Sequence, residues 1–94
     1  MLESLKNSLR ISHNKLDSDI MSNVDACMED LKRVGVFVPF DADDCSAILK
    51  KAIENYVKWQ YDFNGKGEDF RKNYERLRDA LSLNEDYTEG FNNV

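Results

Sequence analysis

The chain has one proline, four glycines and one histidine among its 94 residues, and it has no long apolar run. The scarcity of turn-forming residues argues against a many-stranded sheet and favours helices. A membrane span needs about 20 consecutive apolar residues, which no window approaches. Residues 1–12 contain no apolar stretch of the length that a signal peptide needs. We therefore expect a helical protein that is made in the cytosol and does not enter a membrane.

Cysteine and histidine are too few and too scattered for most forms of site chemistry. Cys27 and Cys45 have no C-x-x-C spacing, so neither a disulfide framework nor a zinc site is indicated. Both are expected to be small buried apolar side chains. His13 has no serine or cysteine motif beside it that would make a nucleophile and base pair. We expect no enzyme, no metal and no cofactor.

Basic residues are also fewer than acidic ones, so the net charge is −5 and the pI is near 4.8. Nucleic-acid binding depends on Lys and Arg displacing counterions, so sequence-specific binding is disfavoured. A helix-turn-helix protein is an alternative in which the helix after Asp41 would read bases. That helix opens with Asp41, Asp43 and Asp44, where phosphates would lie. Salt-dependent binding to random duplex DNA would favour this alternative.

Apolar residues at intervals of three and four are abundant, and they predict four helices over residues 2–10, 15–34, 42–62 and 68–82. The clearest stripe comprises Leu16, Ile20, Val24, Cys27, Leu31 and Val34. Ser12 or Asn14 is expected to cap the second helix, and Gly35 to end it. Asp41 and Asp43 are suitable caps for the third helix.

The helices predict an all-α fold, a small bundle of about four helices with a loose carboxyl-terminal tail. Residues 1–83 form the helical domain and residues 84–94 the flexible tail, whose composition is polar and acidic. The segment from Val36 to Phe40 is strand-like, but Pro39 removes a ladder donor and no second strand candidate exists. We expect an extended, partly buried loop there.

Four aromatic residues within the eight positions from Tyr56 to Phe63 exceed what one stripe of one helix can bury. One interpretation is that they complete the core and cover loops. The other is a contact surface between subunits, since aromatic residues favour both settings. The candidate interface residues are Trp59, Tyr61, Phe63, Val36 and Phe37.

Several segments, in the same order along the chain, resemble a known family of phage proteins. They are Leu5-Lys6-x-x-Leu9-Arg10-Ile11, the Asp17/Asp19 helix start, Ala52 through Trp59, Phe63-Asn64-Gly65, Phe70 through Leu83, and Asp86-Tyr87. From about Leu2 to Tyr87 the chain resembles the head-tail connector proteins of tailed phages and prophages. These proteins are also called adaptor, head-completion or DNA-packaging proteins.

The resemblance implies a structural virion protein that forms a ring of identical copies beneath the portal. Such a ring links the DNA-filled head to the tail at the head-tail junction, with the portal on one side and a downstream connector, stopper or tail protein on the other. DNA would pass through its channel. The resemblance also implies a portal-clasping tail, with Leu83, Tyr87 and Phe91 as anchors. The alternative is a small helical phage regulator or inhibitor that binds a host protein.

Overall fold

The computed structural model of the protein describes residues 1–88, in which it places helices and no strand. The elements in chain order are α1 (Leu2–Leu9), α2 (Asp17–Arg33), the 3-10 turn η1 (Ala42–Asp44), α3 (Ala47–Gln60), the 3-10 turn η2 (Phe63–Gly65), α4 (Gly67–Ser82) and α5 (Glu85–Thr88). The expected all-α fold with four principal helices is confirmed. Phe91 lies outside the described residues.

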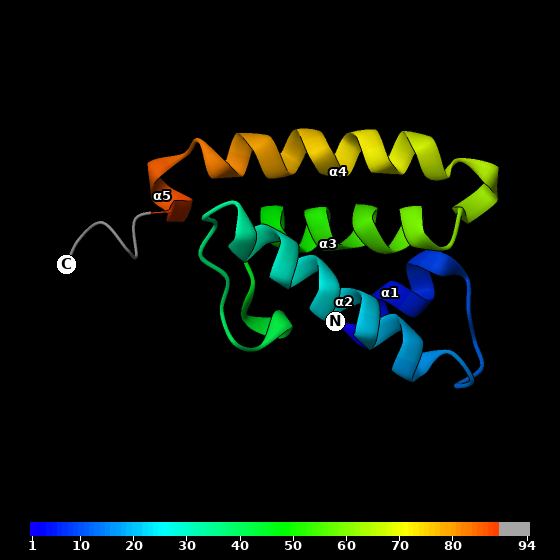
Figure 1. Ribbon diagram of the computed structural model, residues 1–94. Coiled ribbons are helices and arrows are strands. Elements are labelled where there is room, and N and C mark those ends of the chain that lie inside the picture. Colours follow the sequence, from blue (N-terminus) through cyan, green and yellow to red (C-terminus); the bar gives the residue numbers. More distant parts are fainter. Residues whose placement is uncertain (89–94) are drawn as a thin grey trace.

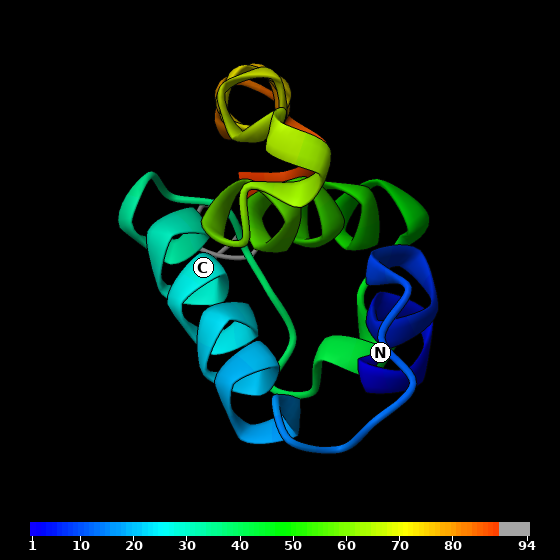
Figure 2. The same ribbon diagram turned by 90° about the vertical axis from the view of Figure 1, so that its right-hand side faces the viewer.

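Helix α3 lies at the centre of the fold. Figures 1 and 2 show α4 alongside α3 on one side, and α1 and α2 on the opposite side. Ala52, Ile53 and Val57 of α3 are all fully buried. This arrangement follows from the broad apolar face of residues 45–60, because a helix that is apolar over much of its circumference must be covered by more than one neighbour.

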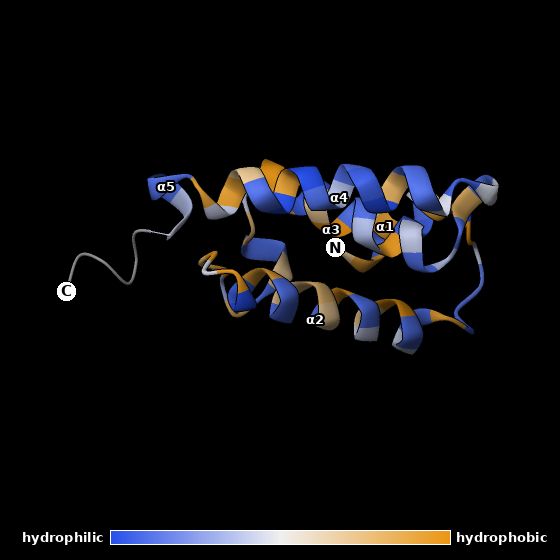
Figure 3. Ribbon diagram, turned by 45° about the horizontal axis from the view of Figure 1, so that its top comes forward, coloured by the Kyte–Doolittle hydropathy of each residue, from blue (hydrophilic) through white to orange (hydrophobic). Residues whose placement is uncertain are grey.

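Helix α4 needs only one apolar stripe because only α3 covers it along its length. Tyr74 and Leu81 are buried, whereas the side facing away from α3 is charged. Figure 3 shows this as a mostly hydrophilic ribbon interrupted at intervals by hydrophobic residues.

Helix α2 ends at a Schellman motif built on Gly35, as the sequence predicts. Gly35 has φ of +91°, which a glycine adopts without a steric penalty. The amide of Gly35 donates to the carbonyl of Lys32 at 2.9 Å, and the amide of Val36 donates to that of Leu31 at 3.0 Å. These two bonds satisfy carbonyls that the helix end would otherwise leave free.

The expected cap of α2 is wrong. The residue before the helix is Leu16, and no side chain caps the first turn. The side-chain oxygen of Asn14 instead accepts a hydrogen bond from Nζ of Lys6 at 2.6 Å. Lys6 is buried and also pairs with Asp17 at 2.9 Å. A buried ammonium group needs such partners, so this pair of contacts fixes α1 to the start of α2.

The third helix begins at Ala47, later than the predicted start at residue 42. Asp41 caps only the short turn η1, where its carboxylate accepts from the amide of Asp43 at 2.9 Å. Cys45 then has an extended backbone, which ends the turn. Ser46 is the cap of α3, and its hydroxyl accepts from the amide of Leu49 at 3.4 Å. Asp41 is therefore a cap, but of a different element, and the carboxylate of Asp43 pairs instead with the amino group of Met1.

The connection between α3 and α4 is tight because Asp62 folds back onto the first residue of α4. The carboxylate of Asp62 accepts a hydrogen bond from the amide of Gly67 at 2.8 Å. A Cβ atom on Gly67 would lie 2.7 Å from that carboxylate and 3.3 Å from the Cα of Asp62. Asp62 and Asn64 adopt positive φ in the turn. The turn therefore positions α4 antiparallel to α3.

Replacing Ile53 by Ala should lower the free energy of unfolding by about 2–5 kcal/mol, because it leaves a cavity at the centre of the bundle. Urea denaturation followed by circular dichroism measures this change. Gln60→Ala, at an exposed position of the same helix, is the matched control and should change stability by less than about 0.5 kcal/mol. Equal stability of the two variants would show that Ile53 is not a core residue.

Candidate assembly surfaces

The carboxylate of Asp30 joins three side chains from α2 and α4. The hydroxyl of Tyr74 donates to it at 2.7 Å, Arg33 pairs with it at 2.8 Å and Arg78 at 3.4 Å. Burial alone raises the pKa of Asp30, but the hydrogen bonds from Tyr74, Arg33 and Arg78 outweigh it and hold that pKa below its ordinary value. Asp30 thus stays ionised and connects α2 to α4.

The thiols and the imidazole show no arrangement typical of catalysis. Both cysteines are free and buried. Burial raises the pKa of the Cys27 thiol to about 12, and burial also raises the pKa of Cys45. Thiols with raised pKa values stay protonated at neutral pH and are poor nucleophiles. His13 is exposed and accepts a hydrogen bond from the amide of Lys15 at 3.2 Å.

No group of three or more His, Cys, Asp or Glu residues within residues 1–88 could hold a metal ion. Nor is any helix in that part of the chain long and apolar enough to cross a membrane.

Trp59, Tyr61 and Phe63, the aromatic candidates for an interface, contact other residues of their own chain. Trp59 packs edge-on against Tyr56, with ring centroids 5.4 Å apart. The hydroxyl of Tyr61 donates to the carboxylate of Asp19 on α2. The ring of Phe63 lies 6.2 Å from that of Phe70. All three stay partly exposed, so a role in an interface is still a prediction, but their contacts also serve the fold.

The loop candidates Val36 and Phe37 point in opposite directions. Val36 is completely buried among the core residues, whereas Phe37 is 54% exposed. The amide of Phe37 donates to the carbonyl of Tyr87 at 2.7 Å. Of these two residues, only Phe37 has an exposed side chain.

The tail candidates also differ in exposure. Leu83, directly after α4, is 86% exposed, whereas Tyr87 in α5 is partly buried against the core. Figure 1 shows α5 turning back from the end of α4 toward the rest of the bundle. Leu83 is therefore an accessible apolar side chain, whereas Tyr87 packs α5 against the core.

Phe40 is an exposed aromatic residue that our sequence predictions did not include. Its relative exposure is 103%, so the whole ring faces outward. Inward alternation through Val36 and Val38 would have placed Phe40 inside, but the chain bends at Phe40 and Asp41 to begin η1. The direction in which the ring of Phe40 points after this bend depends on tertiary structure.

A hollow of about 380 Å³ lies beside Phe40, and the chain's three methionines line it. We call it the methionine hollow, and its lining residues are Met1, Leu2, Met21, Asp25, Met28, Phe40, Asp41, Ala42 and Asp43. Methionine side chains are flexible and polarisable, so such a surface adapts to different contacts. The acidic residues in its lining give it a negative rim.

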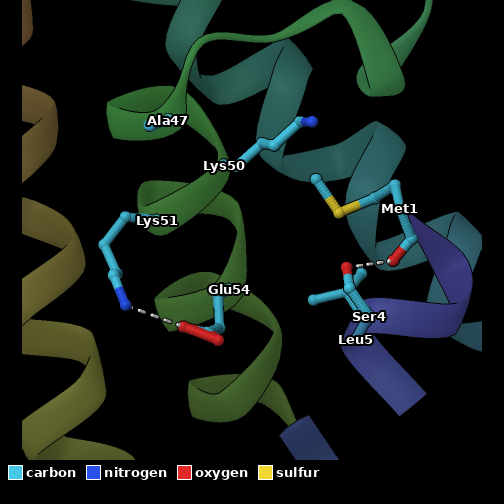
Figure 4. Close-up of a pocket in the computed structure, with 7 residues that line it drawn as sticks. All are labelled: Met1, Ser4, Leu5, Ala47, Lys50, Lys51 and Glu54. Atoms are coloured by element: carbon cyan, nitrogen blue, oxygen red, sulfur yellow. Dashed lines mark hydrogen bonds and ion pairs between the residues drawn. The ribbon is translucent and has the colours of Figure 1, made fainter. Parts of the chain in front are cut away.

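A second hollow, of about 270 Å³, lies between α1 and α3 (Figure 4). We call it the lysine hollow, and its lining residues are Met1, Ser4, Leu5, Ala47, Lys50, Lys51 and Glu54. Figure 4 shows Lys50 and Lys51 extending from α3 in different directions, with Lys51 paired to Glu54 at 3.3 Å. Ala47 and the partly exposed Met1 supply apolar surface beside these charges, and Leu5 is buried beneath them.

These features define a small all-helical protein whose exposed apolar side chains lie at the ends and connections of its helices, where another protein could contact them. Comparison with protein families shows the family to which the chain belongs. A family model described as phage connector protein matches residues 1–88. The chain therefore belongs to the phage connector protein family, which confirms the resemblance seen in the sequence. Comparisons with curated proteins and with solved structures gave no significant match.

The variant Asp30→Asn should be less stable than the wild type at neutral pH, because an amide pairs less strongly with Arg33 and Arg78. The pKa of Asp30 is lowered in the folded state. Its ionised form therefore stabilises the fold at pH values above about 3.9, the ordinary pKa of an aspartate. This contribution is lost as the pH falls through the folded-state pKa. The stability difference between the two proteins should therefore be largest near neutral pH and shrink in acid.

Urea denaturation at a series of pH values measures this difference. Asp25→Asn changes an exposed carboxylate of the same helix and is the matched control, for which we expect little difference from the wild type at any pH. A difference for Asp30→Asn that does not vary with pH would contradict the role assigned to its charge.

Proposed function

We propose that this phage connector protein forms a ring of identical copies beneath the portal and links the DNA-filled head to the tail. The match to the connector family over residues 1–88 is the observation that carries the proposal. Exposed apolar side chains at Phe37, Phe40 and Leu83 support it, because a protein that works in an assembly must offer contact surfaces. Contacts between unlike surfaces of identical copies close into a ring when the rotation between copies fits.

The portal-facing contact is assigned to the carboxyl-terminal side of the chain. Leu83 extends from the end of α4, and α5 follows it directly. Tyr87 and Phe91 complete the set of apolar anchors, Phe91 lying outside the described residues. A segment with little core of its own can rearrange on a partner at small cost to the bundle, which is why we assign it the clasping role.

The remaining surfaces would meet a second copy and a downstream connector, stopper or tail protein. The role is structural and not catalytic, and its place is the head-tail junction of the virion. A net charge of −5 is suited to a channel through which DNA must pass without being held, since like charge weakens contact with the phosphate backbone.

Co-sedimentation of the chain with the portal protein encoded in the same phage or prophage tests this function. The full chain should bind the portal in a fixed ratio. A chain that ends at residue 83 should bind more weakly while keeping most of its helix content, because α1 to α4 carry the core. Leu83→Ser should also weaken binding, since it removes an exposed apolar anchor.

Ala80→Ser, at an exposed position on the same helix, is the matched control and should bind like the wild type. Absence of binding by the full, folded chain would exclude direct docking on the portal. Undiminished binding by both the shortened chain and Leu83→Ser would exclude the clasping role of the tail while leaving the connector function in place.

A further inference from the structure

Two features of the surface are complementary in shape and charge. Phe40 projects fully into solvent and is followed by the exposed Asp41. The lysine hollow offers apolar surface from Met1 and Ala47, with Lys50 beside it, and the carboxylate of Glu54 in its lining is paired with Lys51. An aromatic ring next to a carboxylate matches an apolar hollow next to an ammonium group, because burial of the ring and pairing of the charges can occur together.

The methionine hollow is a less suitable receptor for Phe40 of another copy. Its lining includes Asp25, Asp41 and Asp43, and the amino group of Met1 neutralises one of these carboxylates, that of Asp43. A symmetric contact between two methionine hollows would bring these carboxylates against their equivalents, and juxtaposed like charges oppose association. The charge of the rim therefore favours the lysine hollow over the methionine hollow.

The distribution of charge over the whole fold agrees with this choice. Residues 1–46, which form α1, α2 and η1, contain nine acidic and five basic side chains, whereas residues 47–83, which form α3 and α4, contain six acidic and eight basic side chains. In Figure 2, α1 and α2 lie on one side of α3, and α4 lies on its opposite side. The lysine hollow lies where these two groups meet, between α1 and α3, and it takes both of its lysines from the more basic group.

We propose that Phe40 of one copy inserts into the lysine hollow of a second copy, with Asp41 placed beside Lys50. The contact joins two different surfaces of the same chain, so each copy both gives a phenylalanine and receives one. The proposal rests on the proposed ring, which supplies the neighbouring copies, and it names the residues through which neighbours meet.

Two variants separate the two halves of this contact. Phe40→Ser removes the inserting ring, and it should leave the fold intact because the ring is fully exposed. Ala47→Glu fills the receiving hollow and places a negative charge against Asp41 of the other copy. Ala47 is exposed and is the first residue of α3, where a carboxylate interacts favourably with the helix dipole. Melting by circular dichroism checks that both variants are folded.

Sedimentation velocity and native mass spectrometry over a range of concentrations measure self-association. Each variant alone should self-associate more weakly than the wild type by a factor of about 10 or more. A weakening of this size is typical for the loss of a central contact residue. A mixture of the two variants should form one-to-one pairs, because the intact Phe40 of Ala47→Glu can enter the intact hollow of Phe40→Ser. Leu83→Ser and Gln60→Glu, at exposed positions elsewhere, are the matched controls and should associate like the wild type.

Pairing in the mixture but not in either variant alone would establish the contact. If the variants associate like the wild type, or if the mixture pairs no better than its components, the proposed contact is overturned while a ring formed through other surfaces stays open. A wild type that stays monomeric at every concentration would also overturn it, whereas portal binding in the co-sedimentation assay would still support the connector function. The wild type could instead stop at dimers while the mixture still pairs. This outcome would support the contact and exclude a ring that forms without the portal.

Discussion

Burial of α3 on two opposite sides is the constraint on which the rest of the structure depends. Ala52, Ile53 and Val57 have no exposed surface, so neighbours must cover α3 from both directions. Helix α4 covers one side, and α1 and α2 cover the other. The outer helices then need only one apolar stripe each, and their remaining surface is free to carry charge. The hydrogen bond from Tyr74 to Asp30 also ties α4 directly to α2, alongside the central helix.

The four principal helices could be predicted because helical periodicity is a local property of the sequence. The stop at Gly35 could be predicted for the same reason, since a residue with positive φ at a helix end favours glycine. The caps could not. Asn14 is a good cap by composition, but Lys6 binds its side chain. Asp41 and Ser46 are both acceptable caps, and only the packing of η1 decides which of them begins α3.

The candidate surfaces were harder to predict than the helices, because exposure depends on which residues the folded chain brings together. The sequence shows that the four aromatic residues from Tyr56 to Phe63 are too many for one stripe of a helix. It does not show that Trp59 packs against Tyr56, or that Phe63 lies beside Phe70. The sequence prediction grouped Val36 with Phe37, whereas the fold buries Val36 and exposes Phe37, and it left out Phe40, where the backbone bends. The two hollows combine residues from distant segments and leave no pattern in the sequence.

The hydrogen bond from the amide of Phe37 to the carbonyl of Tyr87 has a consequence for a copy that has not yet joined an assembly. Without α5, an extended segment with two exposed phenylalanines would present an unpaired amide to solvent. Free edges of this kind are where extended chains add to one another and aggregation begins. By covering that edge, α5 keeps the amide of Phe37 paired, which lowers the tendency of the isolated chain to aggregate.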